Sequence, residues 1–113
     1  MTIVVGIFDN PQDLDEAVVR LADKGFEDTV YDQYIVAQEV GVQRPTAQDR
    51  HGIVETFKKH LRDYRVSPEV IASYATSFFH EGKIVVVKTD GKRAPEAEDI
   101  LRRCRASRVN RHG

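Results

Sequence analysis

Residues 67–89, SPEVIASYATSFFHEGKIVVVKT, decide the fold because they predict a helix that leads into the most apolar run of the chain. Ser67 is suited to cap a helix, and Pro68 fits its first position. Gly82 is expected to end the helix, because glycine readily adopts the left-handed conformation found there. The apolar side chains between these limits follow the 3.6-residue helical period and form one predicted stripe: Ile71, Tyr74, Ala75, Phe78 and Phe79.

The apolar run, residues 84–87 (IVVV), predicts a strand that is buried on both faces. Successive side chains of a strand point to opposite faces, so four apolar residues in a row leave neither face to solvent. Asp90 and Gly91 then predict a turn. We expect the rest of the chain to cover this strand.

The N-terminal part predicts a β-α-β unit. Residues 3–8 (IVVGIF) read as a buried strand, and Asn10 with Pro11 is typical of a helix start. A second strand is expected at about residues 29–38, where polar side chains on both faces indicate a sheet edge. Tyr31 and Tyr34 in this strand are candidates to line a groove, although exposed tyrosines are also common on strands.

The remaining elements are a loop over residues 39–48, a helix over residues 49–64, and a last helix that opens at Pro95. The order is therefore β-α-β-α-α-β-α. We expect one α+β domain over residues 1–105, in which a small three-stranded sheet carries helices mainly on one face in a ferredoxin-like arrangement. Residues 106–113 have few apolar side chains and are expected to form a basic, flexible tail.

Composition and the single cysteine lead us to expect a cytoplasmic protein. The chain of 113 residues has an ordinary 41% of hydrophobic residues, and no apolar run approaches the ~20 residues of a spanning helix. Its start has no basic leader of the kind that directs secretion. Cys104 is the only cysteine, so no intrachain disulfide forms. A buried structural thiol is the expected role of Cys104, and a redox-sensitive thiolate is the alternative.

The net charge of −1 conceals an asymmetry between the two ends of the chain. Residues 9–39 carry nine acidic side chains against two basic ones. The candidate anion-binding residues lie in the C-terminal segment, which has no acidic residue: Arg102, Arg103, Arg105, Arg108 and Arg111. This asymmetry indicates an anionic partner, head-to-tail contact between two copies, or simply two solvated faces.

No catalytic, cofactor-binding or metal-binding residue is predicted. Gly6 stands alone, without the glycine spacing of a phosphate-binding loop. His51 and His60 are nine residues apart and would face opposite sides of a helix. A zinc site that combines histidines with Cys104 lacks the usual ligand spacing.

Three segments together resemble the bacterial family of heat-induced, or general, stress protein domains. They are VVGIFDN followed by DLDEAVVRLADKGF at residues 4–26, VSPEVIASYATSFFHEGKIVVVKTDG at residues 66–91, and AEDILRRC at residues 97–104. The chain departs from the family at residues 38–65, where many members carry a glycine-rich insertion. The resemblance implies a non-enzymatic, stress-associated role and supplies no catalytic residue.

Two functions are compatible with the sequence. The first is a small stress-associated domain that acts through self-association, as a homodimer, or through an unidentified protein partner; a sheet of few strands favours such pairing. The alternative is binding of an anion or nucleic acid through the arginine-rich C-terminus. Nucleic acid is the less favoured partner, because no aromatic side chains for base stacking accompany the arginines. No membrane partner is expected.

Overall fold

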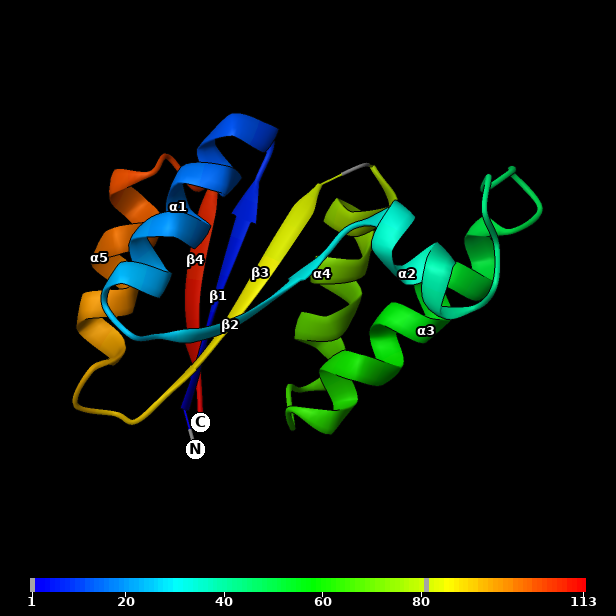
Figure 1. The fold of residues 1–113 in the computed structure, drawn as a ribbon. Helices are drawn as coiled ribbons and strands as arrows, with labels where there is room; N and C mark the ends of the chain where they lie inside the picture. The colour runs from blue at the N-terminus through cyan, green and yellow to red at the C-terminus, as the bar shows by residue number, and fades with distance from the viewer. Residues whose placement is uncertain (1, 81) are drawn as a thin grey trace. The chain divides into compact units, whose positions relative to one another are not determined.

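The computed structural model describes residues 2–80 and 82–113 and divides the chain into two compact units (Figure 1). Unit 1 comprises Met1–Val30 and Lys83–Gly113, and unit 2 comprises Tyr31–Gly82. We expected one domain over residues 1–105. The helices of unit 2 follow one another directly in the sequence and pack on one another, so they form a unit of their own.

Unit 1 is built on a sheet of four strands, where the sequence led us to expect three. The strands are β1 (Thr2–Phe8), β2 (Glu27–Tyr31), β3 (Lys83–Thr89) and β4 (Arg108–His112). Their order across the sheet is β2-β3-β1-β4, and β1 runs antiparallel to both of its neighbours. The α+β class is confirmed, and the valine-rich strand β3 lies between β2 and β1.

Strand β4 corrects the prediction of a flexible tail at residues 106–113. Arg105 adopts a φ of 71° after the last helix, and the Ser107 N–H donates to the Ile7 carbonyl at 2.7 Å. Residues 108–112 then pair with β1 in register. An edge strand needs only backbone hydrogen bonds on one side, and charged side chains are typical there. The basic composition of this segment is therefore that of an edge strand and not of a flexible tail.

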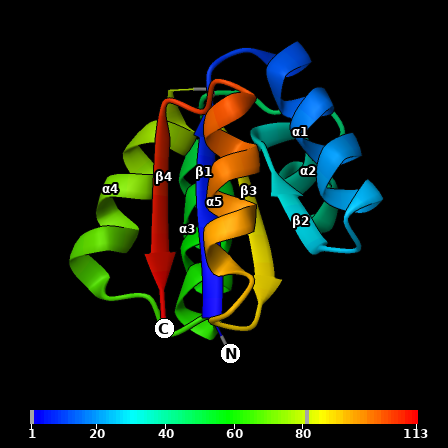
Figure 2. The same ribbon diagram turned by 90° about the vertical axis from the view of Figure 1, so that its left-hand side faces the viewer.

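Helices α1 (Pro11–Asp23) and α5 (Ala94–Arg103) pack on one face of this sheet; Figure 2 shows α5 in front of β1. Gly6 of β1 permits this packing, because a Cβ there would lie 3.1 Å from the Leu101 methyl carbons. The core between sheet and helices consists of apolar side chains: Val4, Phe8, Leu14, Ala17, Leu21, Phe26, Val85, Val87, Ala94, Ala97, Leu101 and Cys104.

The other face of β1 and β3 is buried as well. Ile84 and Val86 alternate with the core residues of β3 and are fully buried. Ile3, Val5 and Ile7 of β1 are at most 4% exposed. The prediction that the valine-rich strand is buried on both faces is confirmed.

Unit 2 contains α2 (Gln33–Glu39), α3 (Arg50–Asp63) and α4 (Pro68–Phe79). Helix α2 replaces the second half of the strand expected at residues 29–38. The Asp32 carboxylate accepts a hydrogen bond from the Ile35 N–H at 2.8 Å and so caps a helix. This capping ends β2 at Tyr31 and turns Val36 inward, where it is fully buried.

The boundaries of the predicted helices agree with those observed, whereas only some of the predicted capping hydrogen bonds are present. Asn10 caps α1 as expected, since its side chain accepts from the Gln12 N–H at 2.8 Å. Ser67 precedes α4 in extended conformation, but its hydroxyl makes no capping hydrogen bond. Glycine is needed at position 82 for a steric reason, because a Cβ there would lie 2.6 Å from the Ser77 carbonyl oxygen.

A candidate binding groove on unit 2

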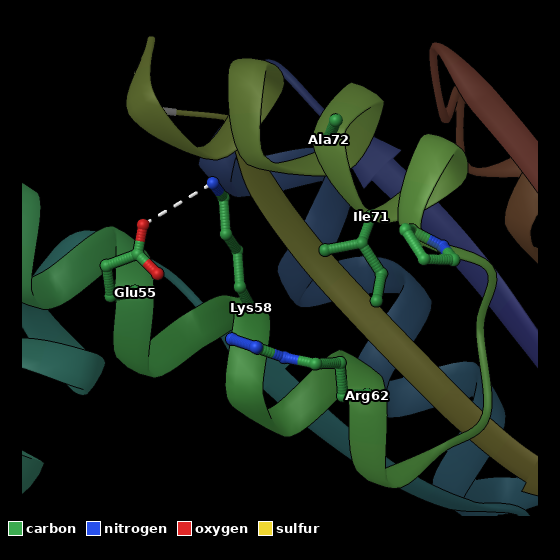
Figure 3. A pocket seen from close by; sticks show the side chains of 6 residues that line it. Glu55, Lys58, Arg62, Ile71 and Ala72 are labelled. Carbon is green, nitrogen blue, oxygen red and sulfur yellow. Dashed lines mark hydrogen bonds and ion pairs between the residues drawn. The ribbon is translucent and has the colours of Figure 1, made fainter.

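The exposed surface between α3 and α4 is hollowed into two adjoining pockets that share Lys58 and Ala72; together we call them the α3–α4 groove. The first pocket, shown in Figure 3, has a volume of about 230 Å³ and is lined by Glu55, Lys58, Arg62, Pro68, Ile71 and Ala72. The second has a volume of about 420 Å³ and is lined by Val54, Lys58, Ala72, Ala75, Thr76, Phe79 and His80.

Helical spacing places the lining residues on facing sides of the two helices. On α3, Glu55, Lys58 and Arg62 follow at intervals of three and four residues and form one row. On α4, Ala72 and Ala75 are one turn apart, and their methyl groups leave the hollow that longer side chains would fill. Figure 3 shows the α3 row facing α4 across the first pocket.

The groove is cationic along α3. The Lys58 ammonium lies 3.5 Å from the Glu55 carboxylate, and this exposed pair contributes little stability. Arg62 has no ion-pair partner in the part of the chain that the structure describes. At the other end of the groove, the Arg50 guanidinium carbon lies 5.2 Å from the centre of the Phe79 ring, within the range of a cation–π contact.

Exposed apolar side chains cluster on unit 2. Phe79, predicted to belong to the buried stripe of its helix, is 39% exposed. Tyr34 and Ile35 of α2 are 67% and 45% exposed. The Gln33 amide donates to the Phe79 carbonyl at 2.8 Å and ties the start of α2 to the end of α4. The expectation that Tyr34 lines a strand groove is wrong, because Tyr34 lies on a helix.

The other predicted tyrosine, Tyr31, is buried inside unit 2. Its hydroxyl lies 3.0 Å from the Tyr64 hydroxyl, and its ring packs edge-on against Phe57 at 5.7 Å between centroids. Burial, then the hydrogen bond with Tyr64, raises the pKa of Tyr31 well above its ordinary value. The His60 ring lies tilted against the Tyr31 ring at 5.3 Å between centroids, and its Nε2 lies 2.8 Å from a Glu39 carboxylate oxygen. These contacts lie within the packing of unit 2 and line neither pocket.

The five predicted anion-binding arginines lie at the end of α5 and in the segment that follows it: Arg102, Arg103, Arg105, Arg108 and Arg111. Two of these arginines form ion pairs with Glu98, since the guanidinium groups of Arg102 and Arg111 both contact its carboxylate. Glu98 is only 13% exposed, so these two arginines hold it at the junction of α5 and β4.

Two more of these arginines pair with carboxylates of unit 1. Arg103 lies 2.9 Å from Asp99, and Arg105 lies 4.0 Å from Asp13. Arg108 begins β4, opposite Ile7 in the register of the sheet. The structure thus distributes the arginines over a helix end and an edge strand, and most of their charge is balanced locally.

Cys104 closes the apolar core of unit 1 and is 1% exposed. Burial raises the pKa of its thiol, with nearby Glu16 adding to the effect. Reactive cysteines have a lowered pKa and access to solvent, so the geometry fits the structural role. No three His, Cys, Asp or Glu side chains within residues 2–80 and 82–113 lie where they could hold a metal ion.

Sequence reasoning did not identify the α3–α4 groove. Lys58 and Arg62 read as polar side chains of an amphipathic helix, and Ala72 as an ordinary helix former. Periodicity indicates which face of each helix is buried, but it does not show where two helices leave a hollow between them. The one available signal is the pair Ala72 and Thr76 on α4, small side chains outside the apolar stripe.

The chain matches no known protein family, no curated protein and no solved structure. No helix of the described residues is long and apolar enough to cross a membrane. The similarity to stress protein domains therefore depends on the sequence segments alone, and the geometry of the groove is the main guide to function.

Proposed function

We propose that the protein is a non-enzymatic module that works by self-association, and that the α3–α4 groove is one of the two contacting surfaces. The observation that carries this proposal is the combination of a hollow lined by Ala72 and Ala75 with the exposed, arginine-contacted ring of Phe79. Exposed apolar surface rimmed by polar side chains is characteristic of interaction sites, where aromatic residues and arginine are enriched.

The sheet is less suited to association than the groove. Its edge strands carry charge, with Glu27 and Asp28 on β2 and Arg108 and Arg111 on β4. Such side chains oppose strand-to-strand pairing. Both faces of the central strands are already buried. Contact through helices is the arrangement that remains, and it corresponds to the known mode in which a helix occupies a groove.

The cellular setting follows from the sequence. The resemblance to bacterial stress protein domains supports a stress-associated role, and the single cysteine supports the cytoplasm as its compartment. We also infer that unit 1 belongs to the ferredoxin-like class. Its order β1-α1-β2 and β3-α5-β4, with β3 inserted beside β1, is that of two interleaved β-α-β halves. Figure 1 shows β2 and β3 running in opposite directions, as this class requires.

Anion binding through the C-terminal arginines has weaker support. Glu98, Asp99 and Asp13 pair with four of them, so an incoming anion would compete with carboxylates already in place. Phosphate-dominated binding is strongly salt-dependent. A titration with DNA and RNA at low and high salt separates this function from self-association, which needs no nucleic acid.

Sedimentation velocity over a wide range of protein concentration tests the proposal. We expect the wild-type protein to associate as concentration rises. Ala72→Leu fills the groove and should weaken association by about tenfold or more, which corresponds to about 1.4 kcal/mol. Lys59→Leu adds an apolar side chain to the exposed surface of α3 outside the groove and should leave association unchanged. A wild-type protein that stays monomeric at every concentration would refute the proposed function.

A further inference from the structure

We propose that the α3–α4 groove of one molecule receives helix α1 of a second copy, with Val19 in the hollow and the acidic residues beside it against Lys58 and Arg62. The inference depends on the proposed function of self-association and names the second surface of that contact. It assigns a partner to the groove from the charge and apolar pattern of the chain itself.

Helix α1 has the features that the groove requires. Val19 is 60% exposed, and it is the single large apolar side chain found exposed in the described part of unit 1. Asp15 and Glu16 lie four and three residues before Val19, so all three share the outer face of the helix.

The charges of the groove complement those of α1. Lys58 and Arg62 are four residues apart on α3, a rise of about 6 Å along the helix axis. Arg62 has no ion-pair partner among residues 2–80 and 82–113, and Lys58 has only the weak contact with Glu55. Both cations are therefore available to carboxylates from another molecule. Opposite charges across an interface fix its register and speed the encounter.

The apolar parts of the two surfaces are also complementary in size. Ala72 and Ala75 leave space on α4, and the exposed side chain of Val19 is short and branched. Seating Val19 in the hollow removes it from water together with the neighbouring surface of Phe79. Removal of apolar surface from water is the main driving force for association, and charge complementarity then selects the partner.

The other exposed acidic helix of the chain fits the groove less well. Helix α5 carries Glu98 and Asp99, and both pair with arginines of their own molecule. Glu16 of α1 likewise pairs with Arg20 at 2.7 Å, but the Glu16 side chain is 51% exposed, against 13% for Glu98. Its last turn is basic, with Arg102 and Arg103. No large apolar side chain of α5 is among those exposed. The groove therefore favours α1 over α5.

The proposed contact joins two different surfaces, so each molecule has one α1 to offer and one groove to fill. Such heterologous contacts extend into larger assemblies unless they close into a ring or a reciprocal pair. We expect association to weaken as salt rises, because the ion pairs lie at the rim of the contact.

A charge-exchange experiment tests the pairing. One variant carries Asp15→Lys and Glu16→Lys, and the other carries Lys58→Glu and Arg62→Glu. Each variant alone should associate at least about tenfold more weakly than the wild type, because like charges then face each other. A mixture of the two should recover association close to the wild-type level, because the exchanged α1 of one variant meets the exchanged groove of the other.

Matched variants control for the change in charge. Glu27→Lys changes an exposed acidic residue on β2, and Lys59→Glu changes the neighbour of Lys58 that does not line the groove. Both should associate as the wild type does. Val19→Ala keeps the helix and its charge, and it should weaken association by several-fold even if the doubly substituted α1 proves unstable in a thermal melt.

The outcomes separate this inference from the proposed function. If the groove variant fails to associate while the α1 variants associate normally, another segment occupies the groove; the inference is then wrong and self-association stands. If both variants are weakened but the mixture does not recover, the two surfaces do not meet, and the inference is again wrong. If the wild type never associates, both the inference and the proposed function fail.

Discussion

The two units of the chain differ in how completely they bury their apolar side chains. In unit 1, two helices and a four-stranded sheet enclose the apolar residues, and Val19 is the large one left exposed among the residues described there. In unit 2, three helices leave Tyr34, Ile35, Val40 and Phe79 exposed. A small body of helices has much surface for its volume and buries its apolar side chains less completely.

This difference indicates that the two units have different roles, one in stability and the other in binding. The outer surface of unit 1 is rich in ion pairs between near neighbours, such as Arg102 with Glu98 and Arg103 with Asp99, and exposed pairs of this kind contribute little free energy. The outer surface of unit 2 combines a hollow, unpaired positive charge and aromatic rings. We therefore regard unit 1 as the stable part of the molecule and unit 2 as its principal binding surface.

The largest expected effect comes from the centre of unit 1. Val86→Asp places a carboxylate at a fully buried position, where solvation of the charge is lost and no cation is provided. We expect a loss of about 4 kcal/mol or more of unfolding free energy, enough to unfold the domain. Circular dichroism and a thermal melt measure it.

Thr29→Asp is the control for this substitution, because Thr29 is exposed on strand β2 and the same carboxylate stays in water. A normal melt for the Thr29 variant with an unfolded Val86 variant confirms the role of burial. A normal melt for Val86→Asp would show that the strand is not interior, and the comparison between the units would then lose its basis.

A pair of glycines in unit 2 gives a second, smaller contrast. Gly82→Ala brings a Cβ to 2.6 Å from the Ser77 carbonyl oxygen, so the backbone must shift; we expect a loss of about 2 kcal/mol. Gly52→Ala places a Cβ in open space within α3 and should stabilise the protein by about 0.5–1 kcal/mol.

Urea unfolding curves measure both glycine variants under the same conditions. Opposite signs are the expected result. Equal stabilisation by both substitutions would show that the chain at Gly82 relaxes without cost, and that the close approach to Ser77 does not constrain the end of α4.

The sequence predicted correctly the elements in which the apolar pattern repeats along the whole segment. The stripe that begins with Leu14 and the run at residues 84–87 each repeat one period several times, so α1 and β3 were expected nearly where they lie. Asn10 and Pro11 added a local signal for the start of α1. Local and global preferences agree at these positions.

The predictions failed where one side chain or one backbone contact decides the structure. Asp32 interrupts a segment rich in β-branched and aromatic residues, and its capping bond converts residues 33–39 into a helix. Residues 108–112 form a strand because β1 offers an unpaired edge, which their own composition does not reveal. The groove was missed for a related reason, since it depends on the packing of α3 against α4.

The smallest expected effect concerns Tyr31 and the pH dependence of stability. Its pKa is raised in the folded protein, chiefly by burial, above the unfolded value of about 10. The folded state therefore holds the proton at a pH where the unfolded state has released it. The stabilisation is complete below pH ~10 and is lost as pH rises beyond it. Tyr31→Phe removes this titration, so the stability of the variant should fall less steeply in alkaline solution.

The measurement is the midpoint of urea unfolding at intervals from neutral pH to pH ~11. At neutral pH the variant should lose about 1 kcal/mol, since the hydrogen bond with Tyr64 is removed. Tyr34→Phe is the control, because the Tyr34 side chain is exposed and should leave the alkaline slope unchanged. An equal slope for Tyr31→Phe and the wild type would show that Tyr31 loses its proton in the folded protein as easily as in the unfolded chain. In that case the packing of unit 2 around Tyr31 is looser than the structure indicates, and the difference between the two units is greater than we have argued.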